Sequence, residues 1–521
     1  MALVSEFLYQ YLLDWLCPAM EAMNKQLYGE TYSYRAKNGQ TRTYENTLKG
    51  SGHGDDMVYQ WRVDRLRTII RKLICEDKTR RFLSDGSKSA IYAFNGVCFV
   101  RVEDREIFLK ELLKRAFIEL DLGEKYNDEY PAKAIAMSCL DTISSSDKYL
   151  YRPNRRYVAF RNLVYDLEKF KAVTPKIDQC PAIVLDLEYQ DPKDLDIECG
   201  QKFKLYDNPR KIWETKIFGR GQNDQLPGVI PNPQVADAFQ QWCGSLLADK
   251  SRFKVEYTCI LVGPGSNGKS VLANAILNVF GEQYFSCFSL RQLFKDSDRN
   301  VNIAALQGKI ANFIDDVEDK KMSDDGFKTF ASGGELQGRV PYDKRPIKVK
   351  APPLLCCANS VPETDDDSFG AHRRRLVLHT TQHRFVGEER DTSLTYKLSQ
   401  PEARMYIFHW IVEGYRKFVK NGGDIVLKPE VAKAQEVVMA GSNNMRRWWA
   451  ENEYEPVKEY DKDCWRSLAD LYEEYKAFAE AEGSKQHKRP ELSAMLLQKG
   501  CFKQRLQVGY GFCLRKSKAE L

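Results

Sequence analysis

The eight residues from Gly263 to Ser270 constrain the fold of this chain more than any other stretch. Their sequence, GPGSNGKS, has the form GxxxxGK[ST]; an apolar run of strand type, residues 257–262, precedes it, and a helical pattern over residues 271–280 follows it. Glycines let backbone N–H groups turn toward an anion, and the positive end of a helix dipole adds to the attraction. The sequence therefore predicts a phosphate-binding loop between a strand and a helix, formed by Gly263, Pro264, Gly265, Ser266, Asn267, Gly268, Lys269, Ser270 and Val271.

Two side chains of this loop have expected roles with a nucleoside triphosphate such as ATP. Lys269 is placed to reach the β- and γ-phosphates, and the hydroxyl of Ser270 to bind Mg²⁺. The alternative is a chance match in a glycine-rich turn. The strand before the loop and the helix after it favour phosphate binding.

A pair of carboxylates follows the next strong strand pattern. The apolar run KIANFI, residues 309–314, leads directly into Asp315 and Asp316. We expect Asp315 to hold Mg²⁺ through water and Asp316 to orient or deprotonate an attacking water. The alternative is a solvated acidic turn, because Glu318 and Asp319 follow closely.

Two later motifs complete the predicted nucleotide site. The buried-strand pattern LLCCA, residues 354–358, ends at Asn359, whose amide could position a water molecule on the other side of the γ-phosphate. The basic run AHRRR then ends at Arg374 and Arg375, directly before an apolar strand pattern. Arginines there could reach the nucleotide of a neighbouring subunit and stabilise charge in the transition state. The alternative is a solvated basic cluster on the surface.

Residues 328–350 between these motifs predict a hairpin with a cationic tip. Lys344 and Arg345 lie at the expected tip, and Tyr342 lies beside them. A basic tip with an aromatic neighbour suits the backbone and bases of a single nucleic-acid strand. On these residues alone, an ordinary surface hairpin fits equally well.

The rest of the chain suggests further domains. We expect an amphipathic helix at the N-terminus, a helix-rich domain over residues 1–195, a linker rich in Gly, Pro, Asn and Asp over 196–232, an α/β core over 233–385 and a helical segment over 386–444. In residues 445–521, helices at 465–482 and from about 489, followed by a hairpin turning at Gly509–Gly511, suggest a winged-helix module. That module is basic, since residues 485–521 hold nine Lys and Arg against two Glu.

Composition excludes some classes of protein. The 14 cysteines contain no CxxC pair and only six histidines occur, so we expect reduced thiols and no structural zinc. No targeting segment or membrane span is visible, and we expect a cytoplasmic protein.

The motifs between Gly263 and Arg375 resemble, in their order, those of superfamily 3 helicases, in the branch of poxvirus primase-helicases and phage and plasmid primases. The shared elements are the GxxxNGKS loop, paired acids, a glycine-rich segment at 332–339, the strand ending in Asn359, an acidic loop at 364–367 and an arginine pair before a strand. The resemblance is specific over about residues 235–385. It implies an AAA+-like P-loop NTPase core of α/β class.

This resemblance also implies a function and partners. It predicts an ATP-dependent replicative DNA helicase of a virus, phage or mobile element, acting in the cytoplasm of a host cell. The protein would assemble as a homo-oligomeric ring, usually a hexamer, and move 3′ to 5′ on single-stranded or forked DNA. Lys344 would line the channel and Arg375, or else Arg374, would act in trans. Alternatives are an AAA+ protein remodeller or helicase loader, and an origin-binding initiator that does not unwind.

Two features depart from that family. The second residue of the acid pair is Asp316, where many relatives have Glu. No primase site is recognisable upstream, since Asp186 and Glu188 alone read better as solvated acids at a strand end, so a separate primase is a possible partner.

Overall fold

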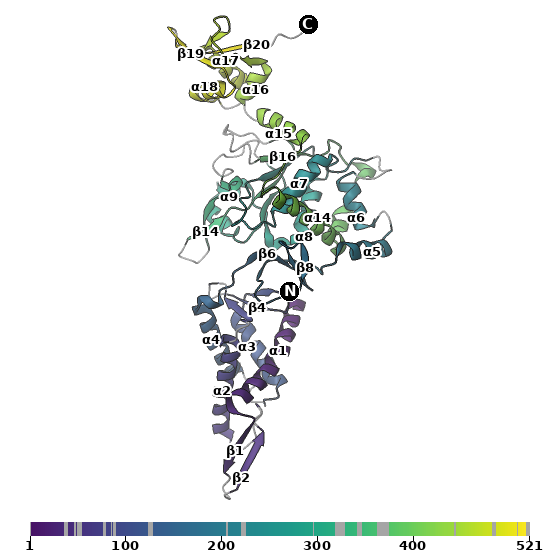
Figure 1. Cartoon of the computed structure of the whole chain (residues 1–521), viewed down its shortest axis with the longest axis vertical. Coiled ribbons are helices and arrows are strands. Elements are labelled where there is room, and N and C mark those ends of the chain that lie inside the picture. The colour runs from purple at the N-terminus through teal and green to yellow at the C-terminus, as the bar shows by residue number, and fades with distance from the viewer. Residues whose placement is uncertain are drawn as a thin grey trace. The chain divides into compact units, whose positions relative to one another are not determined.

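The structure is a computed structural model with a mixed α/β fold, several sheets and many helices (Figure 1). The chain forms two compact units, residues 1–189 and 190–521. The structure describes residues 2–35, 40–45, 48, 55–76, 80–84, 86, 90–122, 129–204, 207–219, 226–294, 296–317, 329–340, 346–361, 375–441, 444–481, 486–507 and 509–516.

Helices α1 to α4 form the main core of the first unit, where they lie side by side (Figure 1). The expected N-terminal helix is confirmed as α1, and its buried residues Leu8, Leu12, Leu16 and Met20 recur at helical spacing because they line one face. The helical elements are α1 (Ala2–Tyr28), α2 (Asp55–Arg71), the π-helical turn η1 (Lys72–Glu76), α3 (Arg105–Glu119), α4 (Glu129–Ser145) and η3 (Asp147–Tyr149).

Three small sheets accompany these helices. One is a two-stranded antiparallel hairpin, one has the order β3-β4-β5, and one has the order β8-β7-β6-β9 with β6 and β9 parallel. The strands are β1 (Thr31–Arg35), β2 (Thr41–Glu45), β3 (Phe82–Ser84), β4 (Ile91–Phe94), β5 (Phe99–Val102), β6 (Asn154–Ala159), β7 (Val164–Asp166), β8 (Lys171–Val173) and β9 (Pro181–Val184).

A five-stranded parallel sheet forms the centre of the second unit. Its order is β11-β12-β15-β10-β16, and all its neighbouring pairs run parallel. The central strands β10 and β15 are buried throughout, as expected for continuous apolar runs covered on both faces. The strands are β10 (Thr258–Val262), β11 (Phe285–Ser286), β12 (Ala311–Ile314), β15 (Leu354–Ala358) and β16 (Arg375–His379).

Helices surround this sheet in the second unit. Helix α8 follows β10 and contacts both α13 and α14. The helical elements up to α15 are α5 (Pro192–Lys202), α6 (Pro209–Ile212), η5 (Trp213–Ile217), α7 (Pro233–Ser245), α8 (Lys269–Phe280), η6 (Glu282–Tyr284), α9 (Leu290–Phe294), α10 (Arg299–Ala304), η7 (Gly387–Glu389), α13 (Leu394–Ser399), α14 (Pro401–Lys420) and α15 (Pro429–Gly441).

Two glycines bring α7 and α14 into close contact. A methyl group added at Gly414 would lie 1.9 Å from the carbonyl oxygen of Gln240, and one added at Gly244 would lie 2.1 Å from the backbone nitrogen of Tyr415. The contact also carries polar bonds, because Lys417 Nζ donates to the Asp237 carboxylate and the Gln240 amide oxygen, each at 2.6 Å. The two backbones therefore meet directly, with no room for a side chain between them.

The stretch 196–232 differs from the linker that its composition suggested. It contains most of α5, all of α6 and the π-helical turn η5, and Trp213 is buried against Phe218 and Trp410. The residues that suggested a linker act instead as helix starts: Asn208 and Asn232 cap α6 and α7, each followed by Pro at the first helical position.

The expected hairpin after the acid pair is confirmed. Strand β13 (Glu335–Arg339) pairs antiparallel with β14 (Pro346–Lys350). Its tip, with Tyr342, Lys344 and Arg345, lies outside the described residues, as does the predicted acidic loop at 364–367.

The C-terminal part of the second unit has a hydrophobic core of its own. Two details differ from expectation: the helix predicted from Trp465 begins at Leu468, because residues 465–467 pair with β20 as a strand, and the hairpin turns between Leu506 and Gly509 rather than at Gly509–Gly511. The elements are α16 (Asn444–Glu451), β17 (Tyr454–Pro456), β18 (Trp465–Ser467), α17 (Leu468–Ala481), α18 (Arg489–Gln498), β19 (Phe502–Leu506) and β20 (Gly509–Lys516).

Among the described residues, no helix has the length and apolar character needed to cross a membrane.

The contact between α7 and α14 predicts a large effect of a small substitution. Gly414→Ala should lower the free energy of unfolding by about 1–3 kcal/mol or more, because the added methyl group forces the two backbones apart. Urea unfolding followed by tryptophan fluorescence measures the change.

The matched control is Gly200→Ala in α5, where an added methyl group meets no atom within 4 Å. We expect that variant to be neutral or up to about 1 kcal/mol more stable, since Ala favours helix over Gly. Equal stability of the two variants would contradict the close contact.

Candidate functional site

The site lies where the strands of the parallel sheet end. Residues 263–268 follow β10, Asp315 follows β12, Asn359 follows β15 and Thr380 follows β16. Since these strands are parallel neighbours, their carboxyl ends meet at one edge of the sheet. Such an edge is where open α/β sheets usually bind ligands.

A pocket of about 560 Å³ opens at this edge. Its volume is in the range of sites for small ligands. Most of the described residues that were predicted to bind the nucleotide line it, whereas Gly263 and Pro264 do not. The lining residues are Thr215, Lys216, Leu226, Pro227, Val229, Gly265, Ser266, Asn267, Gly268, Lys269, Ser270, Val271, Asp315, Asp316, Cys357, Ala358, Asn359, Phe385, Glu389, Arg390, Asp391, Thr392, Leu394 and Thr395.

The loop after β10 has a strained backbone. Gly268 has a φ of 89°, and a side chain there would also collide with Val229, whose Cγ2 lies 2.6 Å from the position of an added Cβ. Ser266 has a φ of 62°, which is uncommon for a residue with a side chain. Strain of this kind is found at ligand-binding sites, where the surrounding structure holds it in place.

A buried amide holds this loop against the end of β16. The Asn267 Nδ2 group donates to Thr380 Oγ1 at 2.7 Å and to the Thr381 carbonyl oxygen at 2.9 Å. This bridge requires glycine at position 263, because a Cβ there would lie 2.2 Å from Thr380 Oγ1 and 2.5 Å from Asn267 Nδ2. Asn267 thus joins two neighbouring strand ends.

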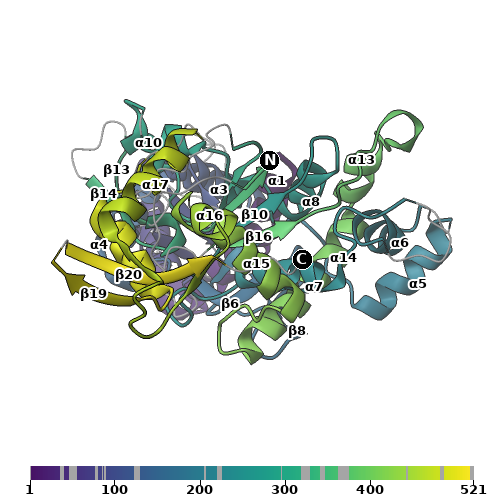
Figure 2. The same ribbon diagram turned by 90° about the horizontal axis from the view of Figure 1, so that it is seen from above.

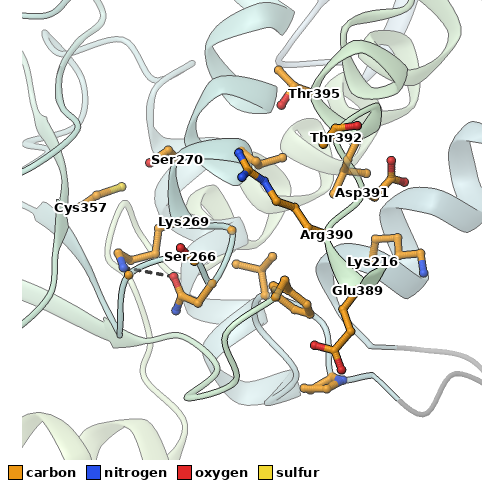
Figure 3. Close-up of a pocket in the computed structure, with 18 of the residues that line it drawn as sticks. Lys216, Ser266, Lys269, Ser270, Cys357, Glu389, Arg390, Asp391, Thr392 and Thr395 are labelled. Atoms are coloured by element: carbon orange, nitrogen blue, oxygen red, sulfur yellow. Dashed lines mark hydrogen bonds between the residues drawn. The ribbon is translucent and has the colours of Figure 1, made fainter. Parts of the chain in front are cut away.

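The ammonium group of Lys269 is held inside the loop. Its Nζ donates to the carbonyl oxygens of Gly263 and Pro264, at 2.7 and 2.9 Å. It also donates to Asn267 Oδ1 at 3.1 Å, the dashed line at Lys269 in Figure 3. The side chain is buried, and burial lowers the pKa of Lys269. A buried cation held by neutral oxygens favours an anionic ligand beside it.

Backbone N–H groups of the loop also favour an anionic ligand. The first N–H groups of α8 have no partner within the helix, as at every helix N-terminus. Within the described part of the chain, the N–H groups of residues 265–268 have no backbone acceptor. Together with the helix dipole, these donors form a site that attracts anions.

The acidic pair lines the same pocket as the loop. Asp315 and Asp316 are both exposed, and no described residue forms a salt bridge with either. Cys357 lines the same pocket; burial, and to a lesser degree the nearby Asp315, raises the pKa of its thiol to about 12, so the thiol is neutral at physiological pH. Asn359 is exposed and lines the same pocket.

Two carboxylates and a serine hydroxyl that line one pocket fit a hard cation. Mg²⁺ takes oxygen ligands, keeps several waters and often needs only one or two carboxylates. Ser270 and Asp315 supply such oxygens at this pocket. Groups of three or more His, Cys, Asp or Glu side chains that could hold a metal do not occur among the described residues.

Sequence reasoning missed the far wall of the pocket. It is formed by η5 with residues 226–229, and by the segment 385–395 after β16. Hydrogen bonds tie both segments to the loop region: Phe385 N donates to Ser266 O, and Thr381 N donates to Val229 O, each at 2.9 Å. No local motif identifies these segments, because their place depends on contacts with distant residues.

Arg390 is the notable cation of this wall. It is exposed, and it extends toward the start of α8, where Ser270 lies (Figure 3). Its acidic neighbours have other partners: Glu389 pairs with His383 at 2.8 Å, and Asp391 accepts from Ser393 and lies 3.7 Å from Lys397. Among the described residues, no carboxylate pairs with Arg390.

Some predicted residues are not placed at the site. Arg374 lies outside the described residues, and Arg375 begins β16, where its backbone pairs with Thr258; its side chain is not described.

The chain is similar to known proteins in part of its length. A family of unknown function, DUF5906, matches residues 261–375, from the end of β10 to the start of β16. None of the curated proteins compared with the chain matches it. Apo structures of the NrS-1 C-terminal region are similar at 9–10% identity and TM-scores of 0.33–0.34, covering 64–65% of this chain and 77–79% of that chain. A TM-score this low supports no inference on fold or function.

The buried bridge predicts the effect of removing its amide. Asn267→Ala should lower the free energy of unfolding by about 1–3 kcal/mol, because the Thr381 carbonyl and the Lys269 ammonium each lose a buried partner. Urea unfolding measures the change.

Asn274→Ala, one and a half turns into α8, is the control. Its half-buried side chain has no hydrogen bond to any described residue, and we expect a change within about 0.5 kcal/mol. If both variants were equally stable, the bridge would not hold the loop.

Proposed function

We propose that this protein is an ATPase that works as a DNA helicase, of the superfamily 3 type that its motifs resemble. One observation carries the proposal: the glycine-rich loop, the paired acids and Asn359 converge on a single pocket at the carboxyl edge of the parallel sheet. These are the groups that bind a triphosphate, hold its metal ion and position a water molecule. The core would be an AAA+-like P-loop domain, and the C-terminal part a winged-helix module.

Binding of ATP would use the loop as it is built. Phosphate oxygens would accept from the N–H groups of residues 265–268 and from the start of α8. Lys269 would exchange its bonds to the Gly263 and Pro264 carbonyls for bonds to phosphate. Because phosphate oxygens would replace the two carbonyl oxygens, the ammonium group would keep its hydrogen-bond acceptors throughout binding.

The two acids would have different roles, one in binding the metal ion and one in activating water. The Ser270 hydroxyl and the Asp315 carboxylate would hold Mg²⁺, which supplies charge neutralisation to the phosphates when bound. Asp316 would orient the attacking water and accept its proton, and the Asn359 amide would fix that water from the other side. Both carboxylates are exposed, which is compatible with the ionised form that these roles need.

Arginines would stabilise charge on the phosphates from two directions. Arg390 would do so in cis, since it lines the same pocket as Lys269 and Ser270. Arg375, or Arg374, would do so in trans from a neighbouring subunit of a ring, which the family resemblance implies to be a hexamer.

Movement on DNA would use the hairpin of β13 and β14. This hairpin lies in the chain between β12 and β15, and the ends of both strands contribute residues to the pocket. A change at the pocket could therefore shift the base of the hairpin. Tyr342, Lys344 and Arg345 at its tip would contact a single strand of DNA.

The central test of this proposal is loss of hydrolysis on removal of one ammonium group. Lys269→Ala should lower ATP turnover by at least about a hundredfold, because a buried cation that would contact the phosphates is lost. Phosphate release measures turnover, and unwinding of a labelled DNA fork on the same preparation tests the helicase activity. Lys254→Ala, which removes an exposed lysine paired with Glu256, should hydrolyse ATP normally. Normal turnover by a folded Lys269→Ala protein would refute the proposed active site.

A second test separates arginines that act in cis from those that act in trans. Arg390→Ala and Arg375→Ala should each hydrolyse ATP poorly, and a trans arginine can contribute about 10³–10⁵ in rate. Mixing Arg375→Ala with Lys269→Ala subunits should restore activity, because hybrid interfaces combine an intact loop with an intact arginine. Mixing Arg390→Ala with Lys269→Ala should not, since each subunit's own site stays defective. Rescue of Arg390→Ala would place that arginine at a neighbour's site instead.

A further inference from the structure

Strands β19 and β20 form an antiparallel hairpin (Figure 2). One face of this hairpin carries Tyr510 together with Lys503 and Arg505. Lys503 pairs in register with Phe512, and Arg505 with Tyr510. Since successive side chains in a strand alternate between the two faces, these four residues share one face. Phe512 is buried in the core, whereas Tyr510 is 50% exposed.

The cations lie directly at the tyrosine ring. Lys503 Nζ is 4.8 Å from the ring centroid of Tyr510, and the Arg505 guanidinium carbon is 5.3 Å from it. Both distances are within the range of a cation–π interaction. Each cation therefore stays close to the ring, and half of the Tyr510 surface still remains accessible.

Neither cation is paired with an acid among the described residues. In the described part of the chain, no carboxylate lies within salt-bridge distance of Lys503 or Arg505, whereas Arg515 on the other face of β20 pairs with Glu455 at 3.3 Å. The sequence from Gln486 to Lys516 contains one acid, Glu491, and its carboxylate is bonded to Lys488 N and His487. Lys503 and Arg505 therefore give this face a positive charge that no described carboxylate pairs with.

We propose that this face of the β19–β20 hairpin is a binding site for single-stranded nucleic acid. Tyr510 stacks on an unpaired base, and Lys503 and Arg505 contact the phosphates on either side. The two cations lie two residues apart on one strand, about 7 Å along it, so they can follow a strand that passes over the ring. An aromatic ring among cations is the arrangement that binds single strands without reading their sequence.

A duplex fits this face less well. Bases within a duplex are stacked on each other, so an exposed aromatic ring gains little from them, whereas bases of a single strand are free to stack on protein. An apolar protein partner also fits less well, because Tyr510 is the one large exposed apolar side chain described on β19 and β20. This site is separate from the nucleotide pocket and does not depend on ATP hydrolysis.

The test measures binding of labelled oligo(dT) to the full chain by fluorescence anisotropy, without nucleotide, at about 50 to 200 mM salt. Tyr510→Ala should weaken binding about 5- to 150-fold, and Tyr510→Phe, which keeps the ring, should bind as the parent does. Lys503→Ala with Arg505→Ala should reduce the slope of log affinity against log salt by about 1.4, the value for two lost phosphate contacts.

Arg515→Ala is the matched control, since it removes one positive charge from the same hairpin on the opposite face. It should bind oligo(dT) nearly as the parent does. A loss equal to that of Arg505→Ala would show diffuse charge attraction and overturn the proposal. So would unchanged affinity of Tyr510→Ala, the result expected if the face binds protein, or equal weakening for a duplex of the same length. Basal ATP hydrolysis, measured on each variant, should be unaffected, so failure here is distinguishable from failure of the ATPase proposal.

Discussion

The buried amide of Asn267 is the interaction on which the geometry of the site depends. One end of this amide binds the strand end after β16, and the other accepts from the Lys269 ammonium. The group is 1% exposed, so none of these bonds competes with water. A buried polar group that forms all its hydrogen bonds rigidifies its surroundings, whereas one that lacks a partner destabilises the folded state. Glycine at position 263 is the condition for this bond, because any side chain there would occupy the same space.

From the residues bound by Asn267, further hydrogen bonds connect the loop to the far wall of the pocket. Thr381, which accepts from Asn267, donates through its backbone to Val229, and Val229 in turn packs against Gly268. The segment after Thr381 then returns to the loop, where Phe385 binds Ser266. The loop, the segment around Val229 and the segment after β16 are far apart in the sequence and hold one another in place. Together they maintain the strained φ angle of Ser266.

This arrangement explains which parts could be predicted from sequence. The loop, the strand patterns before it and before Asp315, and the antiparallel hairpin of β13 and β14 depend on local spacing, which a single sequence displays. The far wall could not be predicted, because Arg390 and the segment 226–229 reach the pocket only through contacts with residues distant in the sequence. The composition of residues 196–232 led to a wrong prediction of a linker, since the Asn and Pro residues that begin helices there are also common in linkers.

The two proposed sites illustrate different ways to hold charge. At the pocket, the Lys269 cation is buried, and its cost of desolvation is offset by oxygens of the loop itself. In the proposed function, an incoming phosphate would replace bonds that already exist. At the hairpin of β19 and β20, Lys503 and Arg505 remain in water and are placed only by the strand register and the Tyr510 ring. The first arrangement suits one ligand in one orientation, as chemistry at a phosphate requires. The second suits a strand of any sequence that must be held and released as it moves, because exposed cations and stacking give contacts that are easily exchanged.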